Sequence, residues 1–135
     1  MKEEDAELVQ LAKKAREKAL ARYSHFKVGA ALRTKEGHVY SGINVESSSY
    51  GLTICAERVA LFKALSEGEQ SFDSLAIVTD SDDLCPPCGA CRQVLWDYAP
   101  NLTIILSNLK GKIQKYKLKD LFPAAFDQSF LDKEE

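Results

Sequence analysis

Three cysteines and one glutamate are the residues of this chain best suited to chemistry. Cys88 and Cys91 are three positions apart in "PCGAC", a spacing at which two side chains at a helix start can face one point. Cys55 adds a third thiolate from a distant part of the sequence, two residues before Glu57. Three protein ligands with an open fourth position are typical of catalytic zinc, which activates a bound water molecule. The pattern therefore predicts a zinc-dependent hydrolytic site with Glu57 as general acid and base.

Cys55 and Glu57 can serve one site only if they lie at the end of a helix. On the side of a regular helix, positions i and i+2 diverge by about 200°. If Cys55 caps the helix and Glu57 lies in its first turn, both side chains can reach past the N-terminus, because Cα–Cβ bonds tilt that way. We expect Arg58, the next residue, to donate hydrogen bonds to the cysteine sulfurs, although a buried ion pair is an alternative role.

A closed structural zinc site is the main alternative. Cys55, Cys85, Cys88 and Cys91 number the four ligands that such a site requires, and an iron–sulfur cluster could use the same four. Two consecutive prolines after Cys85 stiffen the chain and restrict its approach. We therefore expect Cys85 to stay a free thiol. A closed site would also leave Glu57 without a function, which is a second argument against it.

The composition is that of an ordinary globular protein. The 135 residues, 45% hydrophobic and 28% charged, fit one domain over residues 1–135. The apolar runs are too short to cross a bilayer, and "MKEEDAELVQ" has acids where a signal peptide would need basic and apolar residues. The formal net charge of -2 argues against bulk nucleic-acid binding. We expect a cytoplasmic protein with no membrane or nucleic-acid partner.

Helices that alternate with buried strands are predicted to position the chemical groups. Residues 4–20 have the pattern of an amphipathic surface helix, and the run from Cys55 to Gly68 is apolar on nearly every face, which predicts a buried helix. This order predicts an α/β sandwich around a mixed sheet. The other predicted elements are a hairpin of segments 26–34 and 38–46, buried strands at 74–80 and 102–107, a helix from about Cys88 to before Pro100, and a lysine-rich edge strand at 113–118.

Long segments of the sequence resemble the small, homotetrameric, zinc-dependent cytidine deaminases. The matching segments are "YSHFKVGAAL", "GINVESSSYGLTICAERVALFKALSEG" and "PPCGACRQVL", with a weaker match in "DLFPAAF". The resemblance implies a three-layer sandwich with a mixed central β-sheet flanked by helices, one zinc ion per subunit, and a homotetramer whose subunits share active sites. It also implies that cytidine and deoxycytidine become uridine and deoxyuridine plus ammonia, a step of pyrimidine salvage.

The same resemblance implies a role for each site residue. Cys55, Cys88 and Cys91 would bind zinc, whose activated water attacks C4 of the pyrimidine. Glu57 would take a proton from this water, protonate ring nitrogen N3 and assist the departing ammonia. The substrate-binding set would be Asn44 and Glu46 at the ribose hydroxyls, Phe26 near the base, Phe126 in a neighbouring subunit's site, and Val45 and Ala56.

The sequence departs from the family pattern at several positions. Arg22 replaces the usual proline before "YS", Ser47 and Ser48 stand where the family has "NA", and Pro86 stands where serine is common. Cys85 is an additional thiol with no family role. We expect these departures to leave the reaction unchanged. Ser47 is the departure that bears on how the sugar fits into the site.

Other functions remain open at this point. A deaminase of another aminated nucleoside or base would share the zinc motifs, and a non-catalytic zinc module would need no open ligand position. The acidic chain, without an aromatic and basic groove, disfavours a polynucleotide deaminase. Without the resemblance, Asn44 and Glu46 would be ordinary turn or strand-end residues.

Overall fold

A single β-sheet of five strands forms the centre of the protein, in the order β2-β1-β3-β4-β5. The structure is a computed structural model that describes residues 2–131. Strands β3 and β4 are parallel and the other neighbouring pairs are antiparallel, so the sheet is mixed. The strands are β1 (Val28–Thr34), β2 (Val39–Ile43), β3 (Phe72–Thr79), β4 (Thr103–Asn108) and β5 (Ile113–Lys117).

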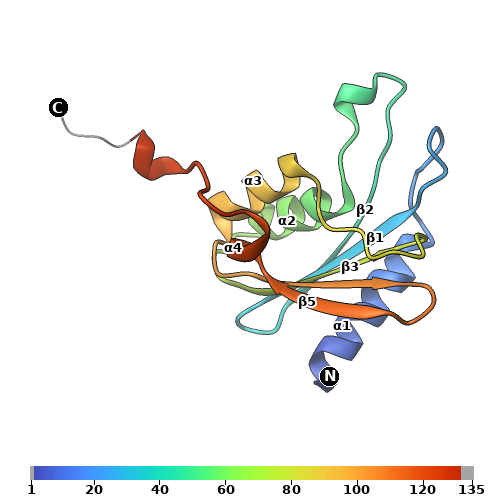
Figure 1. The fold of residues 1–135 in the computed structure, drawn as a ribbon, viewed down its shortest axis with the longest axis horizontal. Helices are drawn as coiled ribbons and strands as arrows, with labels where there is room; N and C mark the ends of the chain where they lie inside the picture. The colour runs from blue at the N-terminus through green and yellow to red at the C-terminus, as the bar shows by residue number, and fades with distance from the viewer. Residues whose placement is uncertain (1, 132–135) are drawn as a thin grey trace.

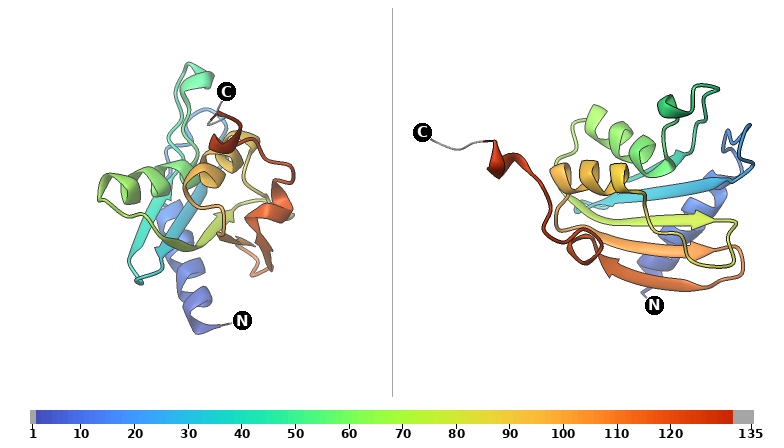
Figure 2. Two further views of the ribbon diagram at one scale, coloured as in Figure 1. Left: turned by 90° about the vertical axis from the view of Figure 1, so that its left-hand side faces the viewer. Right: turned by 45° about the horizontal axis from the view of Figure 1, so that its top comes forward.

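Helices cover both faces of this sheet (Figure 1). Helix α1 lies against one face, and α2 and α3 lie against the other (Figure 2). The predicted α/β class and the three-layer arrangement are confirmed. The helical segments are α1 (Glu3–Arg16), α2 (Ala56–Ser66), α3 (Gly89–Tyr98), the short α4 (Leu118–Leu121) and the 3₁₀ turns η1 (Tyr50–Leu52) and η2 (Gln128–Phe130). No helix of the described part of the chain is both long and apolar enough to cross a membrane.

The strands supply two separate apolar cores, because their side chains alternate between the faces. Ala30 and Leu32 pack in the core under α2 and α3. Ala31, between them, packs with Leu8 and Ala12 of α1. Burial on both faces explains why the central strands read as continuous apolar runs in the sequence.

Two of the expected helices differ from their predictions. Helix α1 ends at Arg16, not at residue 20, and Leu20 instead bridges to Val45 beside the sheet. The prediction that α2 is buried on nearly every face is wrong. Phe62 is 41% exposed and Lys63 is also exposed, because the sheet and α3 cover only part of the helix.

Helix α2 approaches the sheet closely at Gly42 of β2. A Cβ atom at this position would lie 2.2 Å from the carbonyl oxygen of Ala56 and 2.6 Å from the amide nitrogen of Ala60. Both atoms are backbone atoms, so they cannot move aside as the end of a flexible side chain could. The absence of a side chain at Gly42 therefore sets the position of the first turns of α2.

Gly42→Ala should destabilise the protein by about 3 kcal/mol, because the added methyl group overpacks a backbone contact. Gly51→Ala is the matched control, since a Cβ at Gly51 would have no heavy atom of residues 2–131 within 4 Å. Urea unfolding of the two variants measures the difference. Equal stability of both variants would contradict the close approach.

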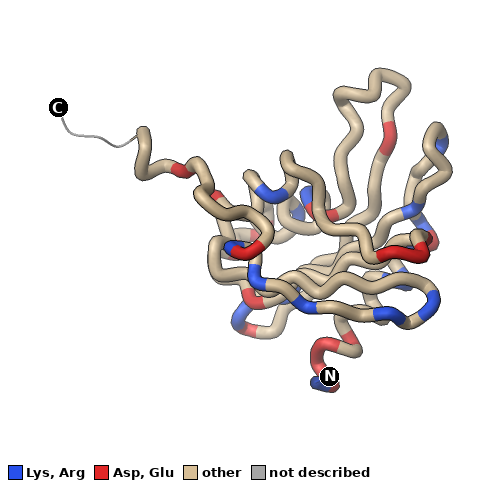
Figure 3. Tube along the Cα trace, in the orientation of Figure 1, with Lys and Arg blue, Asp and Glu red and all other residues tan. Residues whose placement is uncertain are grey.

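A buried carboxylate joins α1 to the sheet. Asp5 is 3% exposed and accepts hydrogen bonds from Arg33 of β1 at 3.1 Å and from Lys115 of β5 at 2.8 Å. Figure 3 shows basic positions along β5 and acidic positions near the start of α1. Strand β5 is an edge strand as predicted, but Lys115 is an ion-pair partner and not only a solvated lysine. Burial raises the pKa of Asp5, and the hydrogen bonds and charges of Lys115 and Arg33 outweigh it, so the pKa is lowered overall.

Asp5→Asn should lower the free energy of unfolding by about 1–3 kcal/mol at neutral pH. The folded-state pKa of Asp5 lies below its ordinary value of 3.8, so the carboxylate stabilises the fold above that pH. This contribution is lost as the pH falls through the folded-state value. Urea unfolding from neutral to strongly acidic pH should show the difference from wild type shrinking in acid, while exposed Asp83→Asn changes little throughout. A difference independent of pH would contradict the role of Asp5.

Candidate metal centre and substrate pocket

The N-termini of α2 and α3 meet at the candidate metal centre. Cys55 is the N-cap of α2 and Cys88 is the N-cap of α3, both with extended backbone conformations, and Cys91 lies in the first turn of α3. Pro86 and Pro87 precede Cys88, and a residue that precedes proline is biased toward extended structure, which favours a helix start only after them. This is the end-on geometry predicted from the sequence, with Glu57 in the first turn of α2.

The spacing of the three sulfur atoms fits a metal ion. The Sγ atoms of Cys55 and Cys88 are 3.7 Å apart, and those of Cys88 and Cys91 are 3.4 Å apart. All three ligand atoms lie within 4.8 Å of one another. Thiolates bound tetrahedrally at about 2.3 Å from zinc lie about 3.8 Å apart. The type of donor atom and the distances between the sulfurs therefore suit zinc.

Arg58 places a positive charge beside these sulfurs. Its Nη2 atom donates a hydrogen bond to Sγ of Cys55 at 3.7 Å. Its Nε atom is buried and has no hydrogen-bond partner among residues 2–131. A buried donor without a partner is costly, so the arginine is held here for its charge near the thiolates and not for a complete set of hydrogen bonds. The expected contact with a cysteine sulfur is present.

The sulfurs and Glu57 influence one another's protonation. A hydrogen bond from the Cys91 thiol, opposed by burial and helped by Arg58, lowers the pKa of Cys55 to about 5. The same hydrogen bond, together with burial, raises the pKa of Cys91. Burial and the negative charge of Cys55 raise the pKa of Glu57 to about 7. A 5% exposed carboxyl group with this pKa can take up or release a proton near neutral pH, which is the property of a general acid and base.

Cys85 lies in the lining of the adjacent pocket and outside the sulfur cluster. Its thiol donates to the carbonyl oxygen of Pro86 at 3.8 Å. Burial, followed by the negative charges of Glu57, Cys55 and Cys88, raises the pKa of Cys85. Within residues 2–131, the group of potential ligands consists of Cys55, Cys88 and Cys91. The geometry therefore does not favour a closed site with four cysteines.

A pocket opens beside the sulfur cluster. Its volume of about 290 Å³ is close to the lower limit for ligand pockets, which is about 300 Å³. Its lining includes Cys55, Cys88 and Glu57 from the candidate centre. Four of the substrate-binding residues expected from the resemblance also line it: Phe26, Asn44, Glu46 and Ala56. Segments far apart in the sequence thus form one site.

Several pocket residues were not anticipated from the sequence. Thr79 and Ile77 come from the end of β3, next to a parallel neighbour. The carboxyl ends of parallel strands commonly border ligand sites, so the end of the apolar run "SLAIVT" was an available signal. Thr53 and Ser24 also line the pocket, and Ser24 lies inside the matching segment "YSHF".

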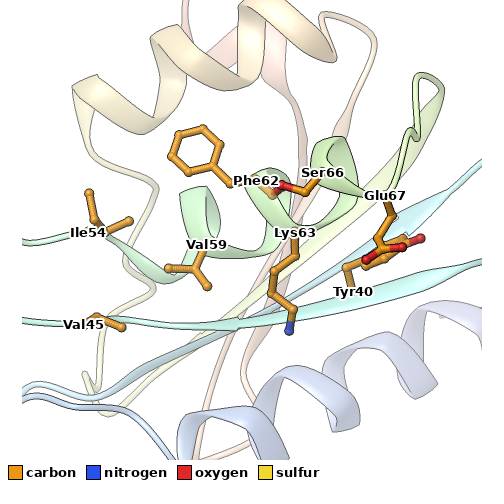
Figure 4. Close-up of a pocket in the computed structure, with 8 residues that line it drawn as sticks. All are labelled: Tyr40, Val45, Ile54, Val59, Phe62, Lys63, Ser66 and Glu67. Atoms are coloured by element: carbon orange, nitrogen blue, oxygen red, sulfur yellow. The ribbon is translucent and has the colours of Figure 1, made fainter.

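Val45 and Phe126 are not brought to this pocket. Because side chains alternate along an extended segment, Val45 points away from the side used by Asn44 and Glu46. It lines a separate hollow of about 740 Å³ beside α2, with Tyr40, Ile54, Val59, Phe62, Lys63, Ser66 and Glu67 (Figure 4). None of the three clustered cysteines lines that larger hollow.

Phe126 lies in the C-terminal segment, which extends away from the sheet (Figure 1). Its side chain is 53% exposed and stacks on Phe130, with ring centroids 5.6 Å apart. The side-chain amide of Gln93 in α3 donates a hydrogen bond to the carbonyl oxygen of Phe126 at 2.8 Å, which holds the segment to the protein. Phe126 therefore presents an aromatic surface away from the pocket of its own chain.

Comparisons with known proteins agree with this geometry. Residues 2–106 match the family described as the cytidine and deoxycytidylate deaminase zinc-binding region. A cytidine deaminase from Sporosarcina psychrophila is 46% identical, with 92% of this chain and 92% of that protein aligned. One from Halalkalibacterium halodurans is 51% identical, over 88% of this chain and 91% of that protein.

A solved structure supports the same assignment. The crystal structure of cytidine deaminase from Burkholderia pseudomallei has a TM-score of 0.88 and 47% sequence identity, and the match covers 93% of this chain and 100% of that chain. The family match at residues 2–106 spans the residues that line the pocket and those of the sulfur cluster. The chain therefore belongs to the cytidine and deoxycytidylate deaminase family.

Proposed function

We propose that this protein is a zinc-dependent cytidine deaminase, which converts cytidine and deoxycytidine to uridine and deoxyuridine with release of ammonia. One observation carries the proposal: a cluster of three cysteine sulfurs at metal-binding distances adjoins the pocket, which two of these cysteines line together with the buried Glu57. The same pocket is lined by Phe26, Asn44 and Glu46. The relatives named cytidine deaminase support the choice of substrate.

Cys55, Cys88 and Cys91 would hold one zinc ion per chain. Bound zinc would lower the pKa of a water molecule and so supply a nucleophile at neutral pH. The positive ends of α2 and α3 and the guanidinium group of Arg58 stabilise the ionised sulfurs. These positive groups offset the excess negative charge that three thiolates leave on a dication.

Glu57 moves the protons of the reaction. As a carboxylate it accepts a proton from the attacking water, and as an acid it delivers that proton to N3 of the pyrimidine ring. It then assists proton transfer to the C4 amino group, which leaves as ammonia when the carbon–nitrogen bond breaks. Its burial limits the access of competing water and raises its pKa, which helps the carboxyl group to act as an acid as well as a base.

The neighbouring groups position the nucleoside. Asn44 and Glu46 bind the ribose hydroxyls, Phe26 forms a wall near the base, and Ala56 contributes the first turn of α2 to the pocket. A carboxylate at Glu46 would repel a phosphate on the sugar, which favours free nucleosides over nucleotides. The formal net charge of -2 also favours free nucleosides over nucleic acid.

The proposed assembly is a homotetramer that acts in the cytoplasm, in pyrimidine salvage, with the whole chain as one catalytic domain. Phe126 would reach the pocket of a neighbouring subunit, because its side chain is exposed and lies outside its own pocket. Phe62 is exposed in the lining of the hollow beside α2. This hollow offers further apolar surface for contact between subunits.

Glu57→Gln should reduce the turnover of cytidine by about 10²- to 10⁴-fold, because the amide cannot carry the proton. Absorbance of the pyrimidine measures turnover, and zinc content and melting temperature should equal those of the wild type. Glu17→Gln, at the exposed C-terminal end of α1, is the control and should keep full activity. Wild-type turnover in a zinc-loaded Glu57→Gln variant would rule out this role.

Replacing single cysteines separates an open site from a closed one. Cys91→Ser should lose most of its bound zinc, because it removes one of three ligands. Cys85→Ser should keep one zinc ion per chain, because Cys85 lies outside the sulfur cluster. Elemental analysis after gel filtration gives the stoichiometry. Zinc loss from Cys85→Ser would instead indicate four cysteine ligands.

A further inference from the structure

A loop beside the pocket is fastened to Glu46 by three hydrogen bonds. Oε1 of Glu46 accepts from the backbone N–H groups of Tyr23 at 2.9 Å and Ser24 at 3.0 Å. Oε2 of Glu46 accepts from the hydroxyl group of Ser24. Both carboxylate oxygens are thus engaged by one short segment that lies more than 20 residues away in the sequence.

Asn44 fastens the other end of the same loop. Its Oδ1 atom accepts from the N–H group of Val28 at 3.0 Å, and its Nδ2 atom donates to the carbonyl oxygen of Phe26 at 2.8 Å. Asn44 is only 7% exposed, so these bonds lie in the protected part of the site. Asn44 and Glu46 therefore hold the segment from Tyr23 to Val28 at both ends.

The hydroxyl group of Ser24 connects Glu46 to Phe26. It donates to Glu46 and accepts a hydrogen bond from the N–H group of Phe26 at 3.0 Å. His25 lies between Ser24 and Phe26 with φ of 60°, in the left-handed region that few residues other than glycine adopt. Such a conformation persists where surrounding contacts impose it, and the bonds of Ser24 are among those contacts.

We propose that Ser24 is a positioning residue, which holds the Glu46 carboxylate for the sugar and the Phe26 backbone for the base wall in one arrangement. The proposal rests on the assignment of the pocket to a nucleoside. Ser24, Phe26, Asn44 and Glu46 all line that pocket. Contacts to the sugar and to the base are therefore coupled through one hydroxyl group.

The hydrogen bonds that Glu46 already accepts also limit which hydrogen bonds a sugar can form with it. A carboxylate has about four acceptor positions, and Tyr23 and Ser24 use three of those on Glu46. The remaining position can only accept a hydrogen bond, so the ligand must offer a hydroxyl donor. The hydroxyl and N–H groups of Ser24, the N–H group of Tyr23 and the nearby charge of His25 lower the pKa of Glu46, which keeps this acceptor ionised.

Ser24→Ala and Ser24→Thr in the zinc-loaded protein test the proposal. Ser24→Ala should raise KM for cytidine about tenfold and change kcat less than about twofold, because binding geometry is lost and the reacting groups remain. Ser24→Thr keeps the hydroxyl group at an exposed position and should restore KM. Ser74→Ala is the matched control, since Ser74 also donates to a carboxylate, that of Asp73 at 2.9 Å, but does not line the pocket.

A second measurement does not depend on turnover. Carbon-13 NMR of glutamate-labelled protein, with the Glu46 signal assigned by its loss in Glu46→Gln, reports the pKa of this carboxyl group directly. Ser24→Ala should raise that pKa, and Ser24→Thr should return it toward the wild-type value. His25 is unchanged in both variants, so its charge contributes equally to each titration.

The outcomes separate this proposal from the proposed function. A wild-type protein that does not deaminate cytidine refutes the proposed function, while the NMR titration still decides whether Ser24 holds Glu46. An active wild type whose Ser24→Ala variant keeps both KM and the Glu46 pKa overturns the role of Ser24. A fall in kcat at constant KM would also overturn it, because the defect would then lie in the reaction and not in positioning.

Discussion

The meeting of two helix N-termini is the constraint on which the rest of the site depends. Cys55 and Cys88 are caps, so their side chains reach forward from α2 and α3 and not sideways. The two helix dipoles then stabilise ionised sulfur at the same place where the sulfurs are close enough to share a metal ion. The sheet must hold both helices with their N-termini together, since neither helix alone contains all three cysteines.

Charge explains the residues that surround the sulfurs. Three thiolates carry more negative charge than a dication neutralises. The side chain of Arg58 contacts the cluster although one of its buried nitrogens has no hydrogen-bond partner in the part of the chain that the structure describes. Burial, and then the negative charge of Cys55, raises the pKa of Glu57 beside this cluster. A glutamate that would be fully ionised in water is thereby able to exchange a proton near neutral pH.

Local patterns in the sequence predicted much of the fold and the cluster of three cysteines. The spacing of Cys88 and Cys91, and the placement of Cys55 before an apolar helix, depend on short-range geometry and could be predicted. Side-chain alternation along 44–46 could also have separated Val45 from its neighbours, although the family resemblance grouped them together.

Contacts between distant segments could not be predicted in this way. The pair of Asp5 and Lys115 spans 110 residues, and the bond of Ser24 to Glu46 depends on how a loop folds back over a strand end. The exposure of Phe62 depends on how much of α2 its neighbours cover, which periodicity alone does not give. Such features follow from tertiary packing, and residue spacing carries no direct signal for them.

Gly29 of β1 and Gly42 of β2 affect the mechanics of the site. A Cβ atom at Gly29 would lie 2.0 Å from the carbonyl oxygen of Ala12 in α1, and Gly42 has the same relation to α2 on the opposite face. The two glycines lie on paired strands at adjacent register positions, so both helices press backbone to backbone on one small part of the sheet. At these two glycines, the backbone of each helix lies directly against the backbone of the strand. Helix α2 cannot move closer to the sheet at Gly42, so the start of the helix that carries Cys55 and Glu57 is supported directly by the strand backbone beneath it.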